Sequence, residues 1–229
     1  MKGQQLTLGL QLKDDATFEN FYPGDNSAVL SHLHAFLSPQ CIESFIYLWG
    51  PPSVGRTHLL QACCHANVDQ GNIYLDLSDH SLAPSVLIDL EYLSLVCLDN
   101  IDAVMGDSAW EEALFHFYNR LQTEKASLLV TALVSPNYLA CQLADLKSRL
   151  SAGLILQLLP MNDEQKLSAL KMRAQCRGLD LPTDVGQFLI NHYPREMSTL
   201  FAALETLDQA SMVAKHRLTI PFLKQVLEL

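Results

Sequence analysis

The stretch that decides the fold of this chain reads Gly50-Pro51-Pro52-Ser53-Val54-Gly55-Arg56-Thr57. It directly follows the apolar run 45–49 and directly precedes the helix-compatible run 59–62. A strand, a glycine-bounded loop and a helix are the setting of a phosphate-binding P-loop, because the backbone N–H groups of the loop and of the helix N-terminus together form an anion cradle. The sequence therefore predicts a nucleotide site at this point.

The P-loop departs from the usual pattern at one position, where Arg56 stands in place of lysine. An arginine keeps the positive charge and can donate hydrogen bonds to a phosphate. Its guanidinium is larger and planar, however, so it does not reproduce the contacts that the usual lysine ammonium makes with the β- and γ-phosphates. We expect nucleotide binding to be kept and hydrolysis to be impaired.

Composition limits the classes of protein that this chain can belong to. Its 229 residues are 49% hydrophobic and 17% charged, which suits one large core or one core with a small satellite domain. A net charge of −10 and a pI near 5.1 argue against a free-standing nucleic-acid binder, which would carry clustered lysine and arginine. No apolar run approaches the roughly 18 residues of a membrane span, and the N-terminus has no signal-peptide pattern. We expect a soluble, cytoplasmic protein.

The cysteines give no sign of a disulfide framework or a metal site. The six cysteines form no C-x-x-C pair, and we expect them to be reduced thiols. The run Cys63-Cys64-His65 is consecutive on a predicted helix, so its side chains should point in different directions rather than converge on a metal.

Five apolar segments predict a doubly wound α/β domain with a five-stranded parallel sheet. They are separated by stretches long enough for crossovers, and near-continuous apolar runs suit parallel strands that are covered on both faces. The segments are 45–49, 73–77, 95–98, 128–132 and 154–158. We expect three parts: an N-terminal segment over 1–15, an α/β domain over 16–160 and a helical lid domain over 161–229.

Beyond Pro160 the pattern is helical throughout. Asn162 is a predicted N-cap with Gln165 three residues on, and Gly178 is a predicted stop for the same helix. Two further helices are indicated by apolar residues at i, i+3, i+4, i+7 spacing. These sets are Val185, Phe188, Leu189 and His192, and Met197, Leu200, Phe201 and Leu204. A last short helix is expected over 219–229.

The third apolar segment ends in an acidic residue, Asp99. Many strands end in aspartate only because its side chain suits the turn that follows. Together with a P-loop in the same sheet, however, Asp99 predicts a Walker B acid. Thr57 and Asp99 would then hold Mg²⁺. The next residue, where ATPases of this kind place a second carboxylate to polarise the attacking water, is Asn100, an amide that cannot accept the proton. Asp102 lies two residues further on. Arg56 and Asn100 together predict a site that binds nucleotide and turns it over poorly.

With these residues assembled, the chain resembles the DnaA branch of the AAA+ family. The segment 17–26 is similar to the N-terminal box of that branch, whose backbone wraps the nucleotide base. The resemblance covers residues 16–229 and continues through the segments 50–57, 95–102, 119–121, 146–150 and 195–197.

The resemblance implies roles for further residues. Thr131 would be sensor 1, beside the γ-phosphate; Arg149 would be an arginine finger that reaches the nucleotide of a neighbouring subunit; Arg195 would be sensor 2. A threonine at a strand end and a solvated arginine are also ordinary structural features. The expected nucleotide-binding residues are Phe21, Tyr22, Gly50, Pro52, Ser53, Val54, Gly55, Arg56, Thr57, His58, Asp99, Thr131 and Arg195.

Two features set this chain apart from the initiators of that branch. Initiators continue past the lid into a basic DNA-binding domain, whereas this sequence ends at Leu229, so we expect no direct sequence-specific DNA binding. The segment 5–10 is similar to peptides that dock on the sliding clamp of DNA polymerase III, although such a short match can also be an amphipathic strand. Its expected clamp-binding residues are Gln5, Leu6, Leu8 and Leu10.

The resemblance therefore implies a regulator rather than an initiator. Such a protein would hold ADP or another nucleoside diphosphate, dock on the clamp, and present Arg149 to ATP bound by DnaA. It could also assemble with itself. One alternative is a self-sufficient AAA+ ATPase such as a helicase loader, which would need the lysine and the second acid. Another is a DNA-binding initiator paralogue, which would need a basic surface.

Overall fold

Five parallel strands form a single sheet in the order β2-β3-β4-β1-β5. The structure is a computed structural model that describes residues 16–38, 40–67, 71–214 and 217–229. Each of the five predicted segments is a strand whose ends agree with the prediction within one residue, so the fold class is confirmed. The strands are β1 (Phe45–Trp49), β2 (Asn72–Asp76), β3 (Leu95–Asp99), β4 (Ser127–Ala132) and β5 (Leu154–Gln157).

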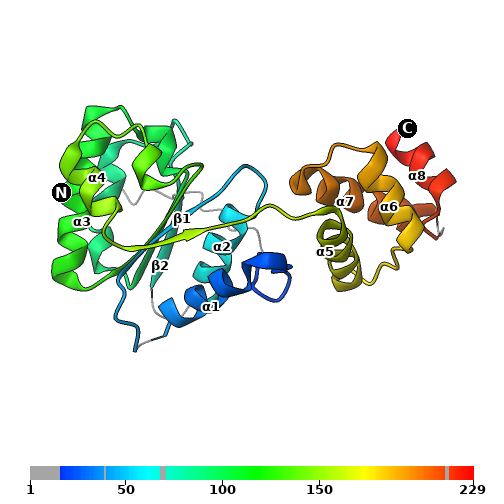
Figure 1. The fold of residues 1–229 in the computed structure, drawn as a ribbon, viewed down its shortest axis with the longest axis horizontal. Helices are drawn as coiled ribbons and strands as arrows, with labels where there is room; N and C mark the ends of the chain where they lie inside the picture. The colour runs from blue at the N-terminus through cyan, green and yellow to red at the C-terminus, as the bar shows by residue number, and fades with distance from the viewer. Residues whose placement is uncertain (1–15, 39, 68–70, 215–216) are drawn as a thin grey trace, which may run out of the picture.

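Helices cover both faces of this sheet (Figure 1). On one face lie α1 (Ser27–Phe36) and α2 (Arg56–Ala66), and on the other lie α3 (Ser108–Glu124) and α4 (Ala144–Leu150). Strand β1 shows the alternation that this requires: Ile46 and Leu48 pack with α1 and α2, whereas Phe45 and Tyr47 pack with α3 and α4. All four of these side chains are buried, as expected for a parallel strand with two covered faces.

The crossover from β2 to β3 consists of two short 3₁₀ turns, η3 (Pro84–Leu87) and η4 (Leu90–Tyr92), which pack against α3. Arg120 of α3 fixes this crossover. Its Nε donates to buried Glu91 at 2.6 Å, and its Nη2 donates to the Leu87 carbonyl at 3.0 Å. The 119–121 segment that contributes to the family resemblance thus has a structural function in this chain.

The lid is a helical domain with its own apolar core. Its helices are α5 (Asp163–Cys176), α6 (Thr183–His192), α7 (Met197–Ala214) and α8 (Ile220–Leu227). Asn162 and Gln165 form the predicted capping box at the start of α5. Gly178 has φ +71° just beyond its end, and the Leu179 N–H donates to the Ala174 carbonyl at 2.9 Å, as in a Schellman cap.

The predicted apolar stripes of α6 and α7 face this core, with one exception. Val185 and Leu189 are buried and Phe188 is partly buried, but His192 is exposed. The imidazole of His192 stacks on Phe188 with ring centroids 4.0 Å apart, and its Nδ1 lies 3.0 Å from the Phe188 carbonyl oxygen. A polar partner inside its own helix holds His192 at the surface.

The segment before α1 joins the α/β domain to the lid. Phe21 belongs to the core beneath α1 and α2, whereas its neighbour Tyr22 packs against the lid core. Asn26 is buried, and its side chain bonds both backbone groups of Leu159 between β5 and the lid: it donates to the carbonyl at 3.0 Å and accepts from the N–H at 2.7 Å. These contacts fix where the lid leaves the sheet.

We expect Asn26→Ala to lower the free energy of unfolding by about 2 kcal/mol, because the backbone groups of Leu159 lose both partners. Asn26→Asp should have an intermediate effect, since a carboxylate still accepts from the Leu159 N–H but cannot donate. Urea denaturation measures this difference, with Asn191→Ala at an exposed position of α6 as the matched control. Equal midpoints for Asn26→Ala and the control would contradict the assignment.

Candidate nucleotide-binding site

The P-loop connects β1 to α2 and has the strand, loop and helix order that the sequence predicts. Ser53 and Gly55 have positive φ values of 61° and 100°. A Cβ at Gly55 would lie 2.6 Å from the ring of Phe21, and one at Gly50 would lie 2.7 Å from the carbonyl oxygen of Leu158. Both glycines are therefore required by close approach of neighbouring atoms.

Asp99 is fully buried at the end of β3 and accepts hydrogen bonds from three other elements. Thr57 of α2 donates to its Oδ2 at 2.6 Å, and the Tyr74 hydroxyl of β2 donates to the same atom at 3.0 Å. Thr131 of β4 donates to Oδ1. Burial, reinforced by the Asp99 carboxylate, raises the pKa of Tyr74, so its hydroxyl stays protonated and remains a donor. The structure thus brings together Thr57, Asp99 and Thr131.

Asn100 follows Asp99 in the left-handed conformation, with φ 54°. Its Nδ2 donates to the Asp76 carboxylate of β2 at 2.9 Å. Burial favours a higher pKa for Asp76, but hydrogen bonds from Ser78 and Asn100 lower it overall. Asp102, the next acid along the chain, accepts the backbone N–H of Leu133 at 3.1 Å, beyond the end of β4. The amide at position 100 is therefore part of the packing at this edge of the sheet.

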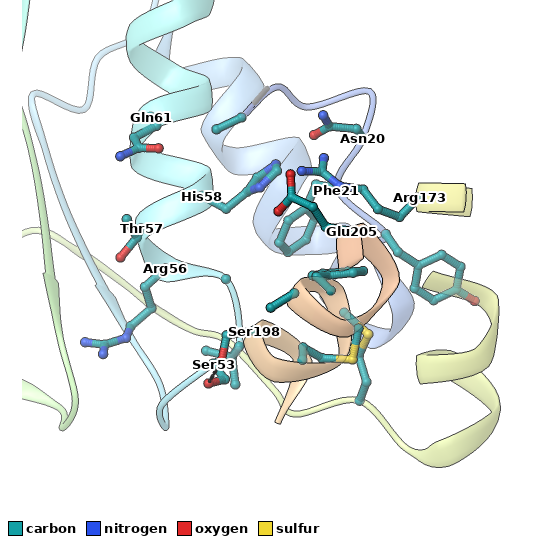
Figure 2. Close-up of a pocket in the computed structure, with 18 of the residues that line it drawn as sticks. Asn20, Phe21, Ser53, Arg56, Thr57, His58, Gln61, Arg173, Ser198 and Glu205 are labelled. Carbon is teal, nitrogen blue, oxygen red and sulfur yellow. Dashed lines mark hydrogen bonds between the residues drawn. The ribbon is translucent and has the colours of Figure 1, made fainter. Parts of the chain in front are cut away.

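Arg56 leaves the start of α2 on the side away from Phe21 and His58 (Figure 2). Its Nη1 is buried and has no hydrogen-bond partner within the described residues. Burial and Asp102 raise the pKa of the Tyr47 hydroxyl, and the positive charge of Arg56 acts in the opposite sense. A buried donor without a partner is costly. An anionic phosphate oxygen would supply what this donor lacks.

A cavity of about 770 Å³ opens between the P-loop, the 16–22 segment and the lid (Figure 2). Its size is typical of a small-molecule site. Eight of the predicted nucleotide-binding residues line it: Phe21, Tyr22, Ser53, Val54, Gly55, Arg56, Thr57 and His58. Asp99 and Thr131 lie behind Thr57 and do not line it, and Gly50 shapes the loop from outside the cavity.

His58 helps to hold the wall of this cavity opposite the lid. Its Nε2 lies 2.8 Å from the carbonyl oxygen of Thr17, and its ring centroid is 5.5 Å from that of Phe21. An aromatic pair on this wall offers flat surface to a nucleotide base.

The lid supplies polar residues that the sequence analysis did not identify. Arg173 of α5, Arg177 just after the end of α5, and Glu205 of α7 line the cavity. Arg177 pairs with Glu205 at 3.3 Å, and the Arg173 guanidinium lies 5.8 Å from the ring centroid of Phe201. In the sequence these charges resemble a solvated helix face. Their i, i+4 spacing shows that 173 and 177 share a face, but only the placement of the lid turns that face toward the P-loop.

Arg195 lies two residues before the start of α7 rather than within it. Together with Pro52 and Ser53 it lines a smaller cavity of about 180 Å³ beside the P-loop, and its guanidinium is paired with Asp163 of α5. The predicted sensor 2 arginine is thus close to the P-loop, but its charge is directed to a lid carboxylate. Its contact with a nucleotide remains a prediction.

Arg149 is exposed on α4, which packs on the face of the sheet opposite α1 and α2 (Figure 1). Its guanidinium is 6.0 Å from the ring centroid of Tyr118. The cavity lies on the other face, beside Phe21 and His58. Arg149 is therefore not placed to serve the cavity of its own chain.

The residues predicted to hold Mg²⁺ fit such an ion. The hydroxyl of Thr57 and the carboxylate of Asp99 are hard oxygen donors, and they lie 2.6 Å apart. No group of three or more histidine, cysteine or acidic side chains within the described residues is placed to hold a metal without other ligands. Because Mg²⁺ usually combines one or two protein oxygens with phosphate and water ligands, this pair suits an ion that arrives with the nucleotide.

Two sequence predictions concern other parts of the chain. The clamp-binding residues Gln5, Leu6, Leu8 and Leu10 lie outside the described residues. Within the described residues, every helix is too short or too polar to cross a membrane.

Comparison with known proteins agrees with this architecture. Residues 163–227 match the family described as Hda, lid domain. Domain III of the replication initiation protein DnaA from Thermotoga maritima has a TM-score of 0.79 and 21% identity over 94% of this chain and 96% of that one. AMPPCP-bound DnaA from Aquifex aeolicus has a TM-score of 0.74 and 18% identity over 90% of this chain and 70% of that one. The Thermotoga maritima RuvB branch migration motor has a TM-score of 0.72 and 17% identity over 95% and 73% of the respective chains.

The parallel sheet, the P-loop, the Asp99 cluster and the helical lid together give this chain the AAA+ fold seen in DnaA and RuvB. Within that fold, the chain is similar to domain III of DnaA over 94% of its length, and residues 163–227 are similar to the lid domain of Hda.

We expect Gly55→Ala to abolish nucleotide binding, because the added Cβ would strain a backbone at φ +100° and collide with the ring of Phe21 in the cavity wall. Gly178→Ala is a matched control: its φ of +71° carries similar strain, but its Cβ meets no atom within 4 Å. Titration with a fluorescent ADP analogue compares the two. Loss of binding in both variants, or in neither, would count against this role of Gly55.

Proposed function

We propose that this protein is an ADP-bound regulator of replication initiation. Docked on the DNA-loaded sliding clamp, it stimulates hydrolysis of the ATP bound to DnaA, and so prevents re-initiation. Its similarity to DnaA domain III and to the Hda lid supports this class of partner. The ligand of its own site is ADP or another nucleoside diphosphate, with Mg²⁺ held through Thr57 and Asp99.

The observation that carries the proposal is the position of Arg149. Its guanidinium is exposed and lies across the sheet from its own cavity. An arginine finger given to another protein must reach outward from its own domain, and it acts by stabilising the charge that develops on the transferred phosphoryl group. Such a residue contributes to catalysis without any turnover at the site of its own chain.

The chain's own site supports holding rather than hydrolysis. The P-loop, the buried Asp99 and the unpartnered Nη1 of Arg56 suit a bound phosphate. The position of the second acid is occupied by Asn100, which donates to Asp76 and cannot act as a base. A self-sufficient ATPase would need that base, so we expect slow turnover by the protein alone.

Recruitment through the clamp is consistent with the charge of the chain. With a net charge of −10, the protein would be repelled by DNA phosphates unless a partner held it on the DNA. The segment 5–10, with its glutamine and three leucines, is the part of the chain to which we assign this docking.

Arg149→Ala should abolish stimulation of DnaA-bound ATP hydrolysis while clamp and ADP binding are kept. An arginine finger is worth about 10³ to 10⁵ in rate, or about 4 to 7 kcal/mol of transition-state stabilisation. The measurement is the conversion of DnaA-bound ATP to ADP over time, with DNA-loaded clamp and each variant at saturating concentration.

Two controls accompany this measurement. Ser148→Ala changes the exposed neighbouring position of α4 and should retain stimulation. The protein without DnaA should release phosphate far more slowly than about 1 s⁻¹, a rate ordinary for enzymes. Faster release would favour the self-sufficient ATPase, and wild-type conversion by Arg149→Ala would exclude the finger.

The double variant Gln5→Ala, Leu6→Ala should lose clamp binding and retain ADP binding, because it removes the glutamine and one apolar anchor of the docking segment. Surface plasmon resonance on immobilised clamp measures the first effect, and ADP titration measures the second. Gln4→Ala, which lies just outside the motif, is the control. Unchanged clamp affinity in the double variant would assign docking to another part of the chain.

A further inference from the structure

Glu111 is a buried carboxylate that holds the start of α4, the helix that carries Arg149. Glu111 lies in the first turn of α3, and only 2% of the residue is exposed. Its Oε2 accepts the N–H of Leu143, the N-cap residue of α4, at 2.7 Å. The N–H of Gln142 lies 3.0 Å from both carboxylate oxygens. The backbone that leads into α4 is thus fixed by one side chain of α3.

The same carboxylate also holds the segment that follows β3. Its Oε1 accepts the N–H of Gly106 at 2.8 Å, and the Gln142 side chain donates to the Gly106 carbonyl at 3.3 Å. Burial by itself would raise the pKa of Glu111, but the backbone donors at 106, 142 and 143 lower it overall. Glu111 therefore remains an anion, and its charge strengthens each of these bonds.

A second contact between α3 and α4 lies directly under Arg149. Tyr118 is buried on α3, and the Arg149 guanidinium is 6.0 Å from its ring centroid. Glu111 and Tyr118 are seven residues apart, so they lie on one face of α3 about two turns from each other. One contact fixes where α4 begins, and the other supports the side chain near its end.

The loop held by Glu111 has no regular structure of its own to fix it. After η6 (Pro136–Tyr138), residues 139–143 run to α4 without helix or strand. Leu146 and Leu150 anchor α4 in the core by apolar packing, which does not define direction as strictly as hydrogen bonds do. The orientation of a seven-residue helix therefore depends strongly on the bonds at its start.

We propose that Glu111 is the positioning residue for Arg149. It fixes α4 on α3 so that the guanidinium is presented at a defined place and angle to the nucleotide of the partner. This inference rests on the proposed function for its catalytic consequence. Its structural half, the fixing of α4, does not depend on that function.

The structural half is tested by Glu111→Gln in the full chain. Glutamine has nearly the same shape, but it places an NH₂ donor where a carboxylate oxygen now accepts backbone N–H groups. Native-state hydrogen exchange read by mass spectrometry should show loss of protection confined to residues 139–150, with the strands and α2 unchanged. Glu112→Gln, at the exposed neighbouring position of the same helix, should match the wild type.

The catalytic half is tested by conversion of DnaA-bound ATP at saturating concentration of each variant. Glu111→Gln should reduce the maximal rate about tenfold, the loss expected for weakened hydrogen bonds to a charged group, while ADP affinity stays the same.

The outcomes separate the two proposals. Unchanged exchange over 139–150, or loss spread over the sheet, would overturn the positioning role. Loss confined to 139–150 with a wild-type maximal rate would overturn its catalytic consequence. Failure of the wild-type protein to stimulate DnaA would reject the proposed function, and the exchange data would still decide whether Glu111 fixes α4.

Discussion

The site depends on a single buried charge, the carboxylate of Asp99. A fully buried carboxylate is stable only when hydrogen bonds satisfy its oxygens, and here the donors come from α2, β2 and β4. These bonds fix the start of α2, and with it the P-loop, against the sheet. Two of these residues, Thr57 and Asp99, are also the ones expected to hold Mg²⁺. Because any movement of α2 away from β3 would leave a buried anion with fewer partners, the binding geometry is held before a ligand arrives.

The lid is held differently, by polar contacts across a junction rather than by a buried charge. Asn26 bonds the backbone of Leu159, and the hydroxyls of Ser53 and Ser198 lie 3.0 Å apart between the P-loop and α7. Tyr22 adds apolar packing on the lid side. A nucleotide held by the P-loop in this cavity would also touch lid residues that line it, such as Arg173 and Glu205, and so would add to this junction. We therefore expect occupancy of the site to be coupled to the position of the lid.

The sequence predicted the strands, the P-loop and the lid well because each has a local signature, such as the apolar run 45–49 or the capping box at Asn162. It could not predict contacts that depend on how distant elements meet. Arg173 and Glu205 enter the cavity only because the lid turns α5 and α7 toward the P-loop. Glu111 has the sequence context of any first-turn acid, and its bonds to 142 and 143 exist only once α4 packs on α3. Arg195 was placed beside the P-loop by resemblance, but its pairing with Asp163 has no sequence signal.

The two departures from an ordinary ATPase site differ in their physical effect. Arg56 changes the shape of a cation but retains its charge, so it can still hold phosphate. Asn100 removes a base and at the same time serves the structure, because its amide donates to Asp76 where an aspartate would place a second carboxylate beside the first. Restoring the acid would therefore introduce repulsion at the edge of the sheet. Local packing thus favours asparagine at position 100, although an asparagine cannot act as a base. Arg149, the cation proposed to act in catalysis, lies on the face of the sheet opposite the cavity, where Tyr118 of α3 supports it. Holding a nucleotide and promoting hydrolysis are assigned to different faces of the same sheet, so each can be lost by mutation without the other.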